Sequence, residues 1–233
     1  MSTPRAGVLL DIDGTLVLSN DAHAKSFSEV LREAGYDVPF ERVRPLIGMG
    51  GDKVLPILTG LDAESPEGKA LSDRKKALFR SKYLPTLKPA PGAHALLERM
   101  LNEGLTLVIA TSASGDEVDG ILRQAELDGL VHSATSSSDA GRSKPDPDII
   151  QAALRSSGLR PTQVIMLGDT PYDIEAAARA GVPTVALRCG GWWSEDDLGG
   201  AVAVYQDPAD MLRQYDLTPL AGAVAREDAA GRG

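Results

Sequence analysis

Residues 7–16 read GVLLDIDGTL, and this stretch decides how the rest of the chain is interpreted. Gly7–Leu10 is a short apolar run that stops at a polar loop, as buried strands of parallel sheets do. Asp11 and Asp13 follow it directly, and carboxylates at positions i and i+2 of an extended chain point to the same side. At the carboxyl end of a parallel strand they would face the crevice where open α/β sheets bind ligands. An acidic turn explains the same letters if they are considered alone.

Three further apolar runs have the same form. They are Leu105–Ala110 before Thr111, Val164–Leu167 before Gly168, and Val182–Leu187 before Cys189. Between the runs, apolar residues recur with helical spacing in segments 93–102, 117–124, 147–156 and 174–180. Short buried strands alternating with helices predict an α/β fold with a doubly wound, Rossmann-like parallel sheet.

The interval from Val17 to Leu87 breaks this alternation, because it holds no convincing buried strand. Its helical candidates are 21–34, 41–46, 52–58 and 66–83. A block of roughly 70 residues is too long for an ordinary crossover connection. We therefore expect three parts, namely an α/β core over 1–16 and 89–217, an inserted helical cap over 17–88, and a disordered tail over 218–233.

The composition excludes several classes of protein. The 233 residues are 42% hydrophobic and 24% charged, as in an ordinary folded domain. The formal charge of −9 disfavours nonspecific binding to nucleic acid or to anionic membranes. The single cysteine, Cys189, cannot form an internal disulfide, and no apolar run is long enough to span a bilayer. With no signal peptide at the N-terminus, we expect a cytoplasmic protein that is a monomer or a weak homo-oligomer.

A second acidic cluster follows the run at 164–167. Asp169 lies at the strand end, and Asp173 lies in the first turn of a helix that Pro171 can open. A helix cap with acids near the positive end of the dipole explains this cluster on its own. Two such clusters at strand ends of one sheet supply four carboxylates, which suit a hard divalent cation such as Mg²⁺.

Two more features fit the same edge of the sheet. Thr111 and Ser112 offer hydroxyl and N–H groups that can hold anionic oxygens, although a plain helix cap is the favoured explanation if they are considered alone. Lys144 lies in the rigid loop SKPDP before a helix; a lone lysine is usually a surface charge. Four ionised acids and one lysine give the site a charge of about −3, which would repel a phosphate dianion unless a divalent cation were bound.

These motifs, in this order, resemble those of the haloacid dehalogenase superfamily, in its branch of phosphatases and phosphomutases with a helical cap after the first strand. The resemblance implies that Asp11 is the nucleophile and forms an aspartyl-phosphate. It implies that Asp13 acts as general acid and then as base, for which we expect a raised pKa. It also implies Mg²⁺ bound by Asp11, by the backbone carbonyl of Asp13 and by Asp169, with Asp173 orienting the metal's waters or Lys144.

The same resemblance implies the substrate contacts. The hydroxyl of Thr111 or Ser112 and the ammonium of Lys144 would neutralise phosphoryl oxygens. Further candidates for substrate binding are Thr15 in the first motif and His23, Gly48 and Lys53 in the cap. Members of this branch place a cap histidine near the acid/base, and the resemblance implies that His23 hydrogen-bonds Asp13. The alternative is that His23 is solvated. Lys75 and Lys76 are expected to lie on a solvated helix face.

Asp13 favours phosphoryl transfer over carbon–halogen cleavage, because the dehalogenases that this chain resembles normally lack it. Gly51 stands where the phosphomutases carry a basic residue, which favours a phosphatase unless Lys53 or Arg44 substitutes. We therefore expect a Mg²⁺-dependent phosphatase of small phosphorylated metabolites. The alternatives are a β-phosphoglucomutase-like sugar phosphomutase and a non-catalytic phosphate-binding module.

Overall fold

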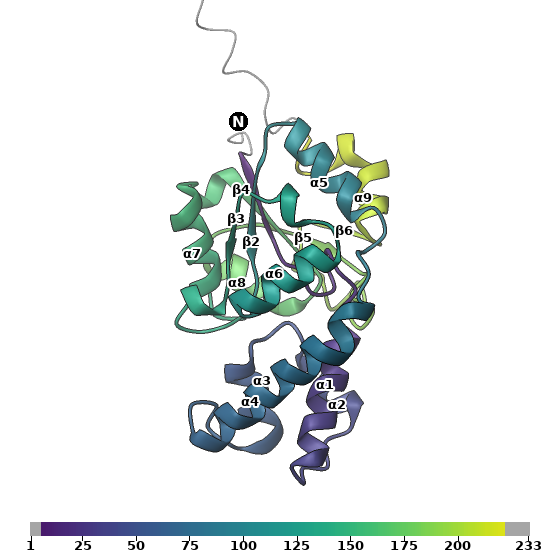
Figure 1. The fold of residues 1–233 in the computed structure, drawn as a ribbon. Helices are drawn as coiled ribbons and strands as arrows, with labels where there is room; N and C mark the ends of the chain where they lie inside the picture. Colours follow the sequence, from purple (N-terminus) through teal and green to yellow (C-terminus); the bar gives the residue numbers. More distant parts are fainter. Residues whose placement is uncertain (1–5, 222–233) are drawn as a thin grey trace, which may run out of the picture.

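Strand β1 (Gly7–Leu10) lies near the centre of a six-stranded parallel sheet in this computed structural model, which describes residues 6–221. The sheet order is β3-β2-β1-β4-β5-β6 (Figure 1). The other strands are β2 (Thr106–Ala110), β3 (Ser133–Thr135), β4 (Val164–Gly168), β5 (Thr184–Leu187) and β6 (Ala203–Tyr205). Because β1 pairs with β2 on one side and with β4 on the other, the strand order reverses at β1, where open α/β sheets place their ligand crevice.

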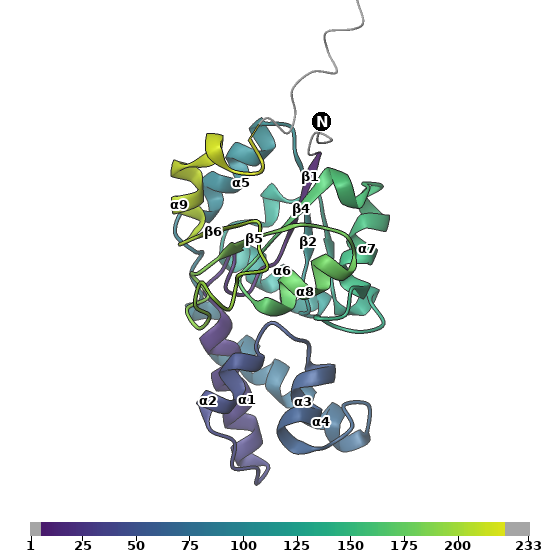
Figure 2. The ribbon, with the colours of Figure 1, turned by 180° about the vertical axis from the view of Figure 1, so that it is seen from behind.

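Helices cover both faces of the sheet (Figures 1 and 2). Helices α5 (Ala93–Asn102), α6 (Gly115–Gln124) and α9 (Pro208–Arg213) pack on the face that includes Leu10. Helices α7 (Asp148–Ser157) and α8 (Pro171–Arg179) pack on the face that includes Leu9. The strands are apolar throughout because both faces are buried. The predicted doubly wound α/β fold is therefore confirmed.

Two strands of the sheet were not expected from the sequence. Both β3 and β6 have three residues, and most of their side chains are only partly buried. They form the two edges of the sheet, where pairing with one neighbour is enough to hold the strand. An apolar run was therefore not required at either place.

Residues 17–88, all of which are described, form helices and no named strand. The helices are α1 (Asn20–Glu33), α2 (Phe40–Val43), α3 (Gly51–Thr59) and α4 (Pro66–Leu78), and α4 continues into a π turn over Phe79–Tyr83 and a 3₁₀ turn over Leu84–Thr86. They enclose a hydrophobic cluster of their own around Phe27, Leu31 and Leu55. They lie beyond the carboxyl ends of the strands (Figure 1).

The ordered chain extends past residue 217, where we expected a tail to begin. Thr218 and Leu220 are buried, and Leu220 belongs to the hydrophobic core on the α5 side of the sheet. The rest of the expected tail, 222–233, lies outside the described residues. The division into core and cap at residues 16 and 88 stays a prediction.

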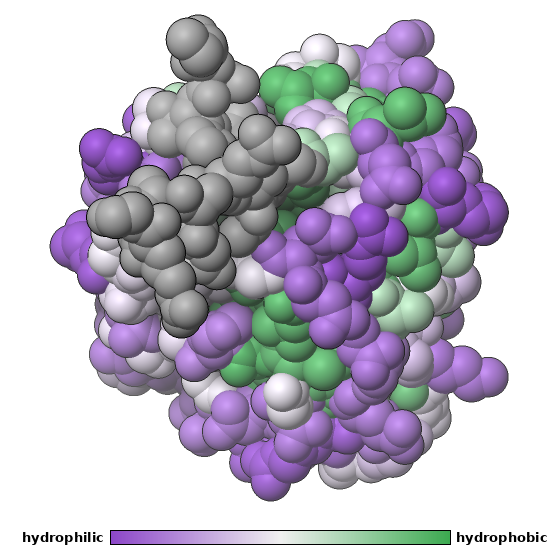
Figure 3. Space-filling view, turned by 90° about the horizontal axis from the view of Figure 1, so that it is seen from above, coloured by the Kyte–Doolittle hydropathy of each residue, from purple (hydrophilic) through white to green (hydrophobic). Residues whose placement is uncertain are grey.

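The surface at the opposite end of the sheet from α1–α4 is mostly polar, with small apolar areas between polar residues (Figure 3). Within residues 6–221, no helix combines the length and the apolar character that crossing a bilayer requires.

Leu9→Ala should lower the free energy of unfolding by about 2–5 kcal/mol, because the side chain is fully buried in the central strand. Leu217→Ala makes the same chemical change at a side chain that is 85% exposed and should cost about 0.5 kcal/mol or less. Urea denaturation of the two variants, compared at constant m-value, checks the difference. Equal losses would contradict the buried position of β1.

Candidate active site

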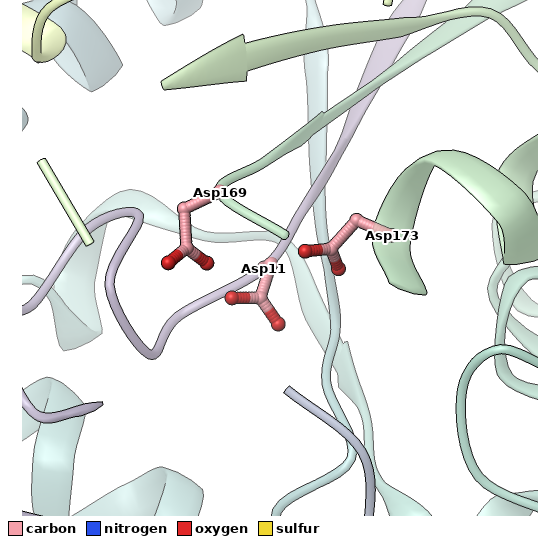
Figure 4. Close-up of side chains that lie close together, drawn as sticks. All are labelled: Asp11, Asp169 and Asp173. Carbon is pink, nitrogen blue, oxygen red and sulfur yellow. The ribbon is translucent and has the colours of Figure 1, made fainter. Parts of the chain in front are cut away.

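Three carboxylates gather at the carboxyl end of the sheet: Asp11, Asp169 and Asp173 (Figure 4). Asp11 follows β1, Asp169 follows the neighbouring strand β4, and Asp173 lies in the first turn of α8. One oxygen of each lies within 4.8 Å of the others, and all three side chains are buried. The structure thus brings together the two acidic clusters that the sequence separates by more than 150 residues.

Lys144 is fully buried among these acids. Its ammonium donates to Asp11 Oδ1 at 2.6 Å and to Asp173 Oδ1 at 2.7 Å. Burial alone would lower its pKa, but the two carboxylates raise it above the ordinary value, so Lys144 is charged. The surface-lysine alternative is therefore wrong, and one positive charge contacts two of the three carboxylates but balances the charge of only one.

Asp173 has a second role as a helix cap. Its Oδ2 accepts hydrogen bonds from the hydroxyl and the N–H of Thr170 at 2.7 and 3.0 Å, while Oδ1 accepts from Lys144. Thr170 in turn accepts from the N–H of Asp173. The helix-cap interpretation of this cluster is therefore confirmed, and the same carboxylate contacts Lys144 with its other oxygen.

The remaining negative charge is not compensated within the protein. Burial raises the pKa of Asp11 to about 7, with Asp173 and Asp13 adding to the rise and Lys144 opposing it. Burial and the charges of Asp173 and Asp11 also raise the pKa of Asp169 well above its usual range. A divalent cation among these oxygens would offset both effects, and an all-oxygen donor set suits a hard cation. The residues present therefore fit a metal ion.

Two polar side chains fix the candidate metal ligands. The hydroxyl of Thr15 lies 3.2 Å from Asp11 Oδ2 and 3.4 Å from Asp169 Oδ1. Asn20, at the start of α1, donates its amide to Asp169 Oδ2 at 2.8 Å. Asn20 was not singled out from the sequence, because nothing in its neighbourhood along the chain links it to residue 169.

Asp13 lies apart from the three clustered carboxylates. Its Oδ1 accepts hydrogen bonds from His23 Nε2 at 2.9 Å and from the hydroxyl of Ser19. Burial raises its pKa, but the interactions with His23, Ser19 and Lys75 outweigh burial and lower the pKa to about 2. The expected raised pKa is therefore wrong for this arrangement, because the sequence did not show how many donors would face the carboxylate.

His23 and Lys75 are buried, contrary to the solvated alternatives for both. The ring of His23 stacks on Phe79 with a centroid distance of 4.0 Å. Lys75 Nζ lies 3.0 Å from His23 Nδ1 and 3.2 Å from Glu117 Oε1. Helical periodicity could have indicated that Lys75 shares a face with Leu71, but it could not supply the partner carboxylate on α6.

A cavity of about 570 Å³ lies between the sheet and helices α1–α4, and its lining includes Asp11, Asp13, His23, Lys75 and Glu117. Thr111 and Ser112 both line it, but Thr111 Oγ1 accepts the N–H of Ala113 at 3.2 Å. Ser112 Oγ is buried and has no hydrogen-bond partner within residues 6–221. The hydroxyl of Ser112 therefore has no competing interaction in the described chain, whereas that of Thr111 accepts one hydrogen bond and keeps its hydrogen to donate.

The loop candidates in the insertion divide into two kinds. Gly48 lines the cavity, and a Cβ there would lie 2.8 Å from Thr170. Lys53 instead pairs with Asp146 at 2.5 Å, outside the cavity lining. Arg44 pairs with Asp21 at 2.7 Å and donates to the carbonyl of Gly190. Neither cation faces the cavity as a substitute for the basic residue missing at position 51.

Comparisons with known proteins agree with this geometry. A family model described as haloacid dehalogenase-like hydrolase matches residues 8–187. The chain is 28% identical over 219 residues to a phosphoglycolate phosphatase from Rhodospirillum rubrum, with 89% of each protein covered. It is 29% identical over 190 residues to the protein SUPPRESSOR OF QUENCHING 1, chloroplastic, from Arabidopsis thaliana, covering 78% of this chain but 18% of that longer protein. The crystal structure of a hydrolase from Pseudomonas syringae is similar with a TM-score of 0.84 and 28% identity, over 92% of this chain and 99% of that chain.

Gly190→Ala should weaken binding of a divalent cation by about tenfold or more. A Cβ at this position would lie 1.8 Å from Asp169 Oδ2, so the carboxylate would have to move. Gly129→Ala is the matched control, because a Cβ there has no atom within 4 Å. The measurement is the rise in melting temperature on cation titration, which needs no substrate. Equal titration curves for both variants would exclude Asp169 as a ligand.

Proposed function

The chain belongs to the family of haloacid dehalogenase-like hydrolases, and we propose that it is a Mg²⁺-dependent phosphatase of small phosphate monoesters that works through an aspartyl-phosphate on Asp11. The observation that carries this proposal is the placement of Asp11, which lines the cavity, beside the buried Lys144 and two further buried carboxylates. The similarity to a phosphoglycolate phosphatase supports a small phosphorylated metabolite as substrate.

The nucleophile is Asp11. Its Oδ1 is held by Lys144, and the hydroxyl of Thr15 is close to Oδ2. An ionised carboxylate is needed for attack on phosphorus, and the raised pKa of Asp11 would leave it partly protonated near neutral pH without a cation. Mg²⁺ bound by Asp11, Asp169 and the backbone carbonyl of Asp13 would favour the ionised form and reduce repulsion of the phosphate dianion.

Asp13 is the proposed acid and base. Its Oδ1 is occupied by His23 and Ser19, and Oδ2 has no partner in the described part of the chain. Oδ2 would therefore give a proton to the departing alcohol and later take one from the hydrolytic water. The lowered pKa suits the second step, and the negative charge of a bound phosphate would raise it for the first.

The transferred phosphoryl group would be held by Ser112, Lys144 and N–H groups after β2. Ser112 Oγ is the free buried hydroxyl of the site, and Lys144 supplies the fixed positive charge. Thr111 would contribute through its hydroxyl, which accepts one hydrogen bond within the loop and keeps its hydrogen to donate, because its N–H already donates to the carbonyl of Thr135. Catalysis of this kind depends on positioning and on electrostatic stabilisation of the transferring group.

The cation arrangement favours hydrolysis over phosphomutase activity. A mutase must hold a second phosphate, and both Lys53 and Arg44 are already paired away from the cavity. Lys76 lines the cavity, and no ion pair is found for it within residues 6–221. Because Lys76 could hold a second phosphate, a β-phosphoglucomutase-like activity is the second candidate function. The complete set of acids around Lys144 argues against a non-catalytic binding module.

The proposed cap is segment 17–88, and the proposed core is formed by segments 1–16 and 89–217. The cap would exclude water during phosphoryl transfer. A cytoplasmic location and a monomer or weak homo-oligomer complete the proposal, and neither nucleic acid nor a membrane is expected as partner.

A panel of small phosphate monoesters should release inorganic phosphate with Mg²⁺ and lose this activity in excess EDTA. Sugar phosphates, nucleoside monophosphates and phosphoglycolate belong in the panel, together with β-glucose 1-phosphate primed by its bisphosphate. Formation of glucose 6-phosphate would decide for the mutase. Full activity in EDTA, or no turnover of any ester, would reject the proposed phosphatase.

Asp11→Asn should reduce turnover by about a thousandfold or more while the fold survives, because the amide cannot form the covalent intermediate. The amide also removes a charge that burial disfavours, so the melting temperature without Mg²⁺ should not fall. Phosphate release and thermal unfolding measured on the same preparation check both statements. A rate near that of the unmodified enzyme would exclude Asp11 as nucleophile.

A further inference from the structure

We propose that Glu117 is a positioning residue for the acid/base Asp13, acting from helix α6 through Lys75 and His23. The inference rests on the proposed function and adds a residue that its mechanism does not use. Four largely buried side chains lie in a row, Glu117, Lys75, His23 and Asp13, with hydrogen-bond distances of 3.2, 3.0 and 2.9 Å between successive members. All four line the cavity.

Glu117 is fixed at the start of α6. Its Oε2 accepts the hydroxyl of Ser114 at 3.0 Å in a capping box, and Oε1 accepts from Lys75. A helix cap alone explains the first contact. It does not explain why the other oxygen meets a buried ammonium from a helix 42 residues earlier in the chain.

Lys75 determines which nitrogen of His23 carries the proton. An ammonium has hydrogens to donate and no lone pair, so His23 Nδ1 must accept from it. In the neutral ring the proton is then on Nε2, which donates to Asp13 Oδ1. The opposite tautomer would present a lone pair to the carboxylate.

The consequence for Asp13 is a choice between its two oxygens. His23 and Ser19 both donate to Oδ1, so Oδ2 is left for proton transfer to the leaving group. The ring of His23 is held in this orientation by stacking on Phe79. If Lys75 moved, His23 would no longer be restricted to one tautomer. The Asp13 carboxylate would then lose the hydrogen bond that orients it.

Glu117 keeps Lys75 in place because the ammonium has few other partners. Lys75 is 8% exposed and is surrounded by the rings of Phe27 and Phe79, at 5.3 and 5.0 Å. Without Glu117 the buried ammonium would keep only the imidazole of His23 as hydrogen-bond partner and would lose its partner carboxylate, which a buried charge needs. Glu117 lies in the proposed core, whereas Lys75 and His23 lie in the proposed cap. The row is therefore complete only when the two parts are docked.

The test compares two leaving groups in the Glu117→Gln variant. An alkyl phosphate needs a proton on its departing oxygen, whereas 4-nitrophenyl phosphate releases a stable phenolate without one. The ratio kcat/KM reports the steps up to release of the alcohol or phenol. We expect a fall of about tenfold or more for the alkyl ester and about threefold or less for 4-nitrophenyl phosphate. Lys75→Met should have the same selectivity, and the double variant should lose little more.

A second measurement does not depend on turnover. In protein labelled with nitrogen-15 in its three histidines, His23 should show a proton on Nε2, assigned by its loss in His23→Gln. Glu117→Gln should change this signal. Ser114→Ala is the control for the capping role, because it removes the hydroxyl that donates to Glu117 Oε2, keeps the weaker backbone N–H contact, and should lower the melting temperature without separating the two esters.

Equal falls for both esters, additive losses in the double variant, or an unchanged His23 signal in Glu117→Gln would overturn the positioning role and leave the proposed phosphatase intact. Absence of hydrolysis of either ester by the unmodified protein would reject the proposed function instead, and the histidine signal would still test the hydrogen-bonded row.

Discussion

The buried ammonium of Lys144 is the interaction on which the site depends. Removing an ammonium from water costs several kcal/mol, and the cost is offset only where carboxylates take the place of water. Asp11 and Asp173 do so from the end of β1 and the start of α8, at 2.6 and 2.7 Å. The ion pairs therefore fix three separate segments of chain relative to one another, and they hold the proposed nucleophile in one orientation.

The same arrangement leaves a deficit of positive charge. Lys144 contacts two carboxylates but carries one positive charge, and Asp169 is held by neutral groups, Asn20 and Thr15. The raised pKa values of Asp11 and Asp169 express this deficit, because each added negative charge is disfavoured by burial and by its neighbours. The carboxyl groups of this site resist ionisation in the absence of a cation, and they offer oxygen ligands. Such a site is suited to bind a cation from solution.

The helical insertion changes the properties of Asp13 more than its own sequence does. Ser19 and His23 come from the start of the insertion and donate to one oxygen of the carboxylate. Lys75 contacts the other ring nitrogen of His23, and Glu117 accepts a hydrogen bond from Lys75. The two aspartates of one motif consequently differ, since burial raises the pKa of Asp11 whereas the hydrogen bonds lower that of Asp13. Different pKa values in neighbouring carboxyl groups allow one to attack and the other to exchange protons.

The sequence by itself determined the alternation of strands and helices, the central strands and the acids at their ends, because strand and helix periodicities and a polar residue after an apolar run are local properties. The order of its motifs resembles that of a known family, and this resemblance implied the candidate roles of Asp11, Asp169 and Lys144. The edge strands β3 and β6 were missed, since three residues that are mostly not fully buried carry too little pattern. Only the tertiary structure decided which groups face one another: Lys75 with Glu117, Asn20 with Asp169, and Lys53 with Asp146. A hydrogen bond between segments distant along the chain depends on how the packed elements are oriented, and no local pattern of letters records that orientation.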